Sequence, residues 1–126
     1  MKRKIKFRAW IEERGCMESV SDISLIGEEI DIYLGDSASG DWYGMDDVVL
    51  MEGIGVYDTY TGEEVFEGDI INVRGGEYYM GVWEFDCIEV ILDIRDVGTL
   101  RMEAQEIRII GNVFEDREKV PYGVSL

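Results

Sequence analysis

One stretch of the chain, residues 56–73, carries its sharpest structural signals. It reads VYDTYTGEEVFEGDIINV, and Gly62 and Gly68 divide it into short segments. The last segment, residues 70–73, is rich in β-branched side chains, which favour strands. A Gly-Asp pair before such a run is typical of a tight turn that enters a strand. The stretch therefore predicts a turn–strand unit around which the rest of the chain is organised.

Apolar and polar residues also alternate in most of the other segments, which is the pattern of half-buried strands. We expect strands at residues 5–11, 16–20, 22–26, 30–34, 48–51, 78–85, 88–94 and 107–114. Gly15 closes a predicted turn at residues 12–15, and Gly81 predicts a bulge or bend in the middle of its strand. Residues 100–106, LRMEAQE, are good helix formers and predict a helical turn.

Short strands separated by turn signals predict a mainly β (α+β) fold with one or two short helices. Residues 56–114 have the size and rhythm of an SH3-like barrel, and residues 1–55 would add an N-terminal β layer. Residues 115–126 form a polar tail. A length of 126 residues predicts a single domain over residues 1–126.

The charge of the chain is strongly negative and unevenly distributed. The formal net charge is −16, yet residues 1–8 carry five bases and no acid. Residues 9–73 hold 17 acids and one base. An acidic surface repels phosphate backbones, so direct nucleic-acid binding is not expected. Two interpretations remain: a solubilising face, or a surface that attracts basic partners or imitates nucleic acid.

The basic N-terminus does not predict a signal peptide, because Glu12 and Glu13 interrupt before any apolar h-region. No apolar run approaches the ~20 residues needed to span a bilayer. Cys16 and Cys87 have no CxxC spacing and suit a reducing compartment. We therefore expect a cytoplasmic protein without membrane contact.

Glu67 and Asp69 are the first candidates for chemistry. Two carboxylates two residues apart on a strand share a face, so they suit an acid/base pair or a hard-cation site. The alternative is that Asp69 accepts hydrogen bonds from nearby backbone N–H groups at a tight strand entry. We favour the alternative.

The remaining chemical motifs fail on their spacing. The loop at residues 36–41 has oxygen ligands, but Ala38 and Gly40 occupy ligand positions of an EF-hand pattern. The chain has no histidine, so neither Cys16 nor Cys87 has a histidine to activate it. We expect no catalytic, cofactor-binding or metal-ligating residues, no cofactor and no enzymatic activity.

The tryptophans, Trp10, Trp42 and Trp83, suit either a base-stacking platform or a core or interface role. The negative charge disfavours the platform. Trp42 and Tyr43 follow the polar loop, so they are predicted to form an exposed anchor at an interface.

Three segments together resemble one family. IKFRAW at residues 5–10, TYTGEEVFEGDII at residues 59–71 and IRIIGNVFED at residues 107–116 resemble, in order, the YopX family of phage and prophage proteins. The resemblance implies a β-rich fold with a barrel-like C-terminal part, a phage origin and self-association. It implies no activity, so no catalytic residues are carried over.

The expected function is that of a phage- or prophage-encoded accessory protein that acts by protein–protein contact as a homo-oligomer. In such an oligomer, the basic residues 2–8 of one chain would face acids of another. The alternative is an acidic DNA mimic, or an inhibitor of a host nucleic-acid-binding protein. Besides a second copy of the chain, a basic host or phage protein is a candidate partner.

Overall fold

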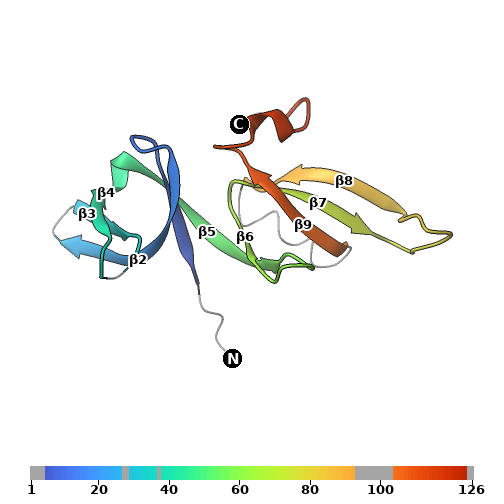
Figure 1. Ribbon diagram of the computed structural model, residues 1–126, viewed down its shortest axis with the longest axis horizontal. Helices are drawn as coiled ribbons and strands as arrows, with labels where there is room; N and C mark the ends of the chain where they lie inside the picture. Colours follow the sequence, from blue (N-terminus) through green and yellow to red (C-terminus); the bar gives the residue numbers. More distant parts are fainter. Residues whose placement is uncertain (1–4, 27–28, 37, 93–103, 125–126) are drawn as a thin grey trace. The chain divides into compact units, whose positions relative to one another are not determined.

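The computed structural model describes residues 5–26, 29–36, 38–92 and 104–124 (Figure 1). The fold is mainly β, and its strands pair in antiparallel fashion. The chain divides into two compact units, Met1–Glu52 and Gly53–Leu126. This division lies close to residue 55, where the sequence places the end of the N-terminal layer. The prediction that residues 1–126 form a single domain is not tested by this division.

Unit 1 is an antiparallel sheet with the strand order β4-β3-β2-β1-β5. Its elements are β1 (Phe7–Ile11), β2 (Cys16–Ile26), β3 (Glu29–Leu34), β4 (Asp41–Gly44), the 3-10 turn η1 (Met45–Asp47) and the first half of β5 (Val48–Tyr57). Gly15, with a φ of 61°, closes the β1–β2 hairpin as predicted. The buried core of this unit contains Ala9, Ile11, Ile32, Leu34 and Val48.

Unit 2 contains the second half of β5 paired with β6 (Glu64–Phe66), and a three-stranded sheet of order β8-β7-β9. Its remaining elements are β7 (Asp69–Gly75), β8 (Phe85–Val90), β9 (Ala104–Asn112) and the 3-10 turn η3 (Arg117–Lys119). The buried core of this unit contains Ile54, Val56, Val65, Ile71, Val73, Ile91 and Ile107.

The central stretch folds as the sequence predicts. Gly62 and Gly68 have φ angles of 77° and 90°, which glycine adopts without a steric penalty. They end the two turns on either side of β6, and β7 begins directly after Gly68. The strand β7 lies between β8 and β9 in its sheet, and its apolar side chains face the core of unit 2.

Two sequence predictions are wrong. Residues 104–106 begin strand β9 and not a helical turn, because pairing with β7 overrides their helix propensity; residues 100–103 of that prediction lie outside the described residues. Residues 78–84 form a loop, and the strand β8 begins at Phe85. Gly81, with a φ of 81°, lies in the turn of that loop and is not a strand bulge.

The SH3-like barrel is not found. In the described ranges no sheet closes on itself: β8 and β9 flank β7 as the two edges of a three-stranded sheet. Alternation identifies strands but does not decide which of them pair. Residues 27–28, between the strands predicted at residues 22–26 and 30–34, lie outside the described residues. So does the end of the strand predicted at residues 88–94.

Candidate functional site

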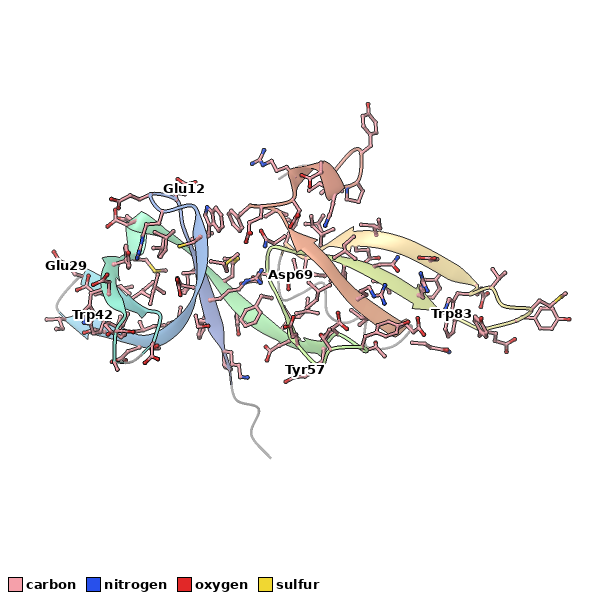
Figure 2. The ribbon with its side chains drawn as sticks, in the orientation of Figure 1. Glu12, Glu29, Trp42, Tyr57, Asp69 and Trp83 are labelled. Atoms are coloured by element: carbon pink, nitrogen blue, oxygen red, sulfur yellow. The ribbon has the colours of Figure 1, made fainter. Side chains whose placement is uncertain are left out.

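An open groove on unit 2 brings together polar and aromatic side chains from β7, β8, β9 and two loops. Its volume is about 690 Å³, and it is lined by Tyr60, Arg74, Tyr78, Gly81, Val82, Trp83, Asp86 and Glu106. A narrow recess shares Tyr60, Arg74 and Glu106 with it and adds Asn72 and Arg108. Figure 2 labels Trp83 beside β7 in this unit.

The floor of the groove is the polar face of the three-stranded sheet. Side chains alternate along β7, so Arg74 lies opposite to the face that carries buried Ile71 and Val73. The strand register places Arg74 beside Asp86 on β8 and beside Glu106 on β9. Arg74 forms ion pairs of 3.4 Å with Asp86 and 3.8 Å with Glu106. Since these pairs are partly exposed, they balance charge more than they stabilise the fold.

One wall of the groove is Tyr60, from the loop between β5 and β6. Its hydroxyl donates a hydrogen bond to Oε2 of Glu106 (2.8 Å), and this bond raises the pKa of Tyr60. The guanidinium of Arg108 lies 4.5 Å from the centre of the Tyr60 ring, within range of a cation–π contact. Tyr60 therefore bridges an acidic and a basic side chain of β9.

Asp58 fixes the loop that carries Tyr60. The backbone N–H groups of Tyr60 and Thr61 donate to its Oδ1 (2.7 and 2.9 Å), and that of Ile109 donates to its Oδ2 (2.8 Å). Thr59 adds a second connection to β9, because its Oγ1 accepts from the N–H of Ile107 (2.8 Å). Burial raises the pKa of Asp58, but the three backbone hydrogen bonds outweigh it, and the pKa lies below its ordinary value.

The opposite wall is the loop at residues 76–84. The rings of Tyr78 and Trp83 contact each other, with centroids 4.7 Å apart. The N–H of Tyr79 donates to the carbonyl of Val82 (3.0 Å), and the N–H of Val82 donates to the carbonyl of Tyr79 (2.9 Å). These contacts fix the shape of the loop. The groove thus offers aromatic faces, hydrogen-bond donors and acceptors, and nearly balanced charge.

Of the two carboxylates Glu67 and Asp69, the structure shows a local structural role for Asp69. Asp69 is buried, and its Oδ2 accepts a hydrogen bond from the N–H of Phe66 (2.8 Å). This is the local bond that the structural interpretation of the sequence predicts. The carboxylate closes the turn at Gly68 and is not directed at solvent.

The structure also places three other residues that the sequence analysis considers: Asp36, Trp42 and Cys87. Oδ1 of Asp36 accepts from the N–H of Ala38 (2.9 Å) within its loop. Trp42 is 51% exposed and lies 5.1 Å from the ring of Tyr33. Burial, together with Glu89, raises the pKa of the Cys87 thiol, which favours the less nucleophilic protonated form.

Glu64 is a buried group that the sequence analysis does not single out. It lies on β6, is 9% exposed, and in the part of the chain that the structure describes neither carboxylate oxygen has a hydrogen-bond partner. Burying an unpaired carboxylate opposes folding. We expect Glu64→Gln to raise the free energy of unfolding at pH 7 by about 1 kcal/mol.

Urea denaturation of the two proteins measures this difference. The control is Glu63→Gln, which removes the same charge from the exposed neighbouring position. A Glu64→Gln protein that is less stable than the wild type would show that the carboxylate has a stabilising partner.

Sequence reasoning misses four residues of the groove and its recess: Tyr60, Arg74, Glu106 and Arg108. They meet only because β7 pairs with β9 and because hydrogen bonds connect the β5–β6 loop to β9. The prediction of a helical turn at residues 100–106 places Glu106 on the wrong kind of element. The available signal is the alternation of residues 104–112, which separates Glu106 and Arg108 from Ile107 and Ile109.

The fold and the groove define a class of small, mainly antiparallel β protein with a polar and aromatic groove on its second unit. Residues 6–120 match the family model described as YopX protein, so the chain belongs to the YopX family. The crystal structure of protein EF1440 from Enterococcus faecalis is similar, with a TM-score of 0.54 and 19% identity. The match covers 95% of this chain and 100% of that chain, and at this identity it concerns the fold alone.

The comparison with curated proteins finds no match. Within the described ranges, no helix has the length and apolar character required to cross a membrane.

Proposed function

We propose that this YopX-family protein is a phage- or prophage-encoded accessory protein without enzymatic activity, which acts in the host cytoplasm through protein–protein contact. It does so as a homo-oligomer. The proposal includes no cofactor and no direct binding of nucleic acid, because a net charge of −16 repels phosphate backbones.

The observation that carries the proposal is an exposed apolar stripe on the β2–β3 hairpin of unit 1. Leu25 and Ile30 pair across the two strands, and Ile23 pairs with Ile32. Ile32 is buried, whereas Leu25 is 72% exposed. The stripe formed by Ile23, Leu25 and Ile30 therefore continues the core outward into solvent. Contiguous exposed apolar surface of this kind marks a contact with another protein.

Charge supports the same proposal. Residues 1–8 carry five bases, while acids dominate residues 9–73. In an oligomer, a basic first segment of one copy can face the acids of another. Such contacts weaken as salt screens them.

Light scattering coupled to size exclusion tests the homo-oligomer. We expect a mass above that of one chain at low salt and a smaller mass at high salt. Leu25→Asp places a charge in the centre of the stripe and is expected to lower the mass at both salt concentrations. Tyr122→Ser, at a fully exposed position outside the stripe, is the control. A wild-type protein that stays monomeric at both salt concentrations would contradict the proposal.

The acidic surface supports a second candidate, a DNA mimic that occupies a basic site on a nucleic-acid-binding protein. Its specific support is a set of exposed acids on unit 1: Asp22, Glu29, Asp36, Asp41, Asp46 and Asp47. This candidate predicts competition with DNA for a basic protein and no dependence on Leu25.

A further inference from the structure

The loop between β7 and β8 presents an apolar tip to solvent. We define the hairpin tip as Tyr78, Tyr79, Met80 and Val82. Met80 is 85% exposed, Tyr79 is 74% exposed, and the other two side chains are also mostly exposed. Figure 1 shows that this loop continues beyond the adjacent end of β9. Four neighbouring exposed apolar side chains form a patch that a soluble protein seldom leaves uncovered.

One residue of the tip adopts a backbone conformation that is unfavourable for its side chain. Met80 has a φ of 52°, and among the described residues it is the one residue other than glycine with a positive φ. Gly81 follows with a φ of 81°. Two successive positive φ angles are typical of a type I′ turn, in which Asn and Gly are favoured and an unbranched apolar residue is not. Strained residues of this kind gather at functional sites, so Met80 is a candidate contact residue.

The tip is also preorganised. The two hydrogen bonds between Tyr79 and Val82, and the ring contact between Tyr78 and Trp83, hold its shape before any partner binds. A contact made by such a rigid loop loses little conformational entropy on association.

Charges beside the tip and in the groove complement each other. Glu77 and Glu84 flank the tip, are exposed, and form no ion pair or hydrogen bond through their side chains in the described part of the chain. In the groove, Arg108 is exposed and stacks on Tyr60, with no carboxylate within ion-pair distance among the described residues. One exposed cation and two exposed carboxylates thus lie on the same unit.

We propose that the hairpin tip of one copy lies in the groove of a second copy, and that the second copy returns the same contact. In this two-fold arrangement, Met80 and Tyr79 pack on the aromatic wall at Tyr60, and Glu77 and Glu84 face Arg108. The inference rests on the homo-oligomer of the proposed function and names a second contact besides the stripe on unit 1. A self-complementary patch of this type closes as a dimer.

A second copy explains more than a small ligand does. A small molecule in the groove would leave Tyr79 and Met80 in solvent, and it would leave Glu77 and Glu84 without partners. The reciprocal contact covers the tip and the groove together and brings Glu77 and Glu84 to Arg108.

Sedimentation equilibrium on the full chain tests the inference through three variants. Met80→Gly relieves the positive φ while it removes the contact side chain, so the fold is retained and self-association weakens by roughly tenfold or more. Arg108→Glu weakens self-association to a similar extent, because it opposes the two glutamates. Adding Glu77→Lys and Glu84→Lys to Arg108→Glu reverses both sides and restores most of the affinity. Tyr122→Ser is the control and leaves the affinity unchanged.

The outcomes separate this inference from the proposed function. Weaker association of Met80→Gly and Arg108→Glu, with recovery in the combined charge reversal, supports the contact. A wild-type oligomer whose affinity is unchanged by these substitutions overturns the contact and leaves the homo-oligomer standing. A monomeric wild-type protein overturns both. Thermal melting of Met80→Gly at or above the wild-type temperature excludes misfolding as the cause of lost affinity.

Discussion

Replacing Asp58 with alanine is expected to lower the free energy of unfolding by about 3 kcal/mol at pH 7. The substitution removes an acceptor that serves three backbone N–H groups, from Tyr60, Thr61 and Ile109. Asp58 is 3% exposed, so water does not readily replace the lost bonds. Urea denaturation followed by circular dichroism measures the change.

The pH dependence identifies the carboxylate as the source of this stability. Because the pKa of Asp58 is lowered in the folded protein, its contribution is present above the unfolded pKa of about 3.9. The contribution is lost as the pH falls through the lower folded pKa. The difference in unfolding free energy between the wild type and Asp58→Asn should therefore be constant above about pH 5 and shrink in more acidic solution.

Glu63→Gln, which removes one charge from an exposed side chain of the same loop, is the matched control and should change stability little. If Asp58→Ala were as stable as the wild type, Asp58 would not connect the loop to β9 in solution. The position of Tyr60 in the groove would then need another explanation.

The second large effect is expected at Gly111, in the IRIIGNVFED segment. A Cβ atom added there would lie 2.6 Å from Oδ2, 2.7 Å from Cγ and 2.9 Å from Cβ of Asp116, which is closer than real side chains approach. Asp116 must then move, although its Oδ2 accepts a hydrogen bond from the N–H of Asn112 (3.1 Å). Gly111→Ala should lower the free energy of unfolding by about 2 kcal/mol, as overpacking does elsewhere.

A double-mutant cycle isolates the cause. Asp116→Ala alone should cost about 1–2 kcal/mol, because it removes an acceptor for Asn112 and an ion pair with Lys119 of 3.5 Å. Combined with Gly111→Ala, it removes the clash, so the double variant should lose about 1 kcal/mol less than the sum of the single losses. If the losses of unfolding free energy of the two single variants simply add, the clash with Asp116 is not the cause. The cost would then lie in the backbone conformation of residue 111.

Two of the family segments contribute to the groove and its recess. Asp58, directly before the TYTGEEVFEGDII segment, fixes the loop that carries Tyr60, and Arg108 of the last segment stacks on that ring. Tyr60 and Arg108 belong to the surface that we propose a second copy covers. A variant that loosens the loop is therefore expected to weaken self-association as well as stability.

The sequence by itself determined the local structure. Gly15 and Gly68 mark turns because their positive φ angles suit glycine, and the Gly-Asp step predicts the bond from Phe66 to Asp69. Alternation located β1, since side chains on a strand take opposite faces regardless of which strand pairs with it. The β-branched run of residues 70–73 located β7. These features depend on residues only a few positions apart.

Only the tertiary structure decided the pairing and the surface. Residues 104–106 became a strand through contact with β7, which overrides their helix propensity, and residues 78–84 became a tight turn although their sequence alternates. The bond from Tyr60 to Glu106 joins residues 46 positions apart. Strand register brings such residues together, and register depends on the burial of a whole face, which no short segment of the sequence specifies.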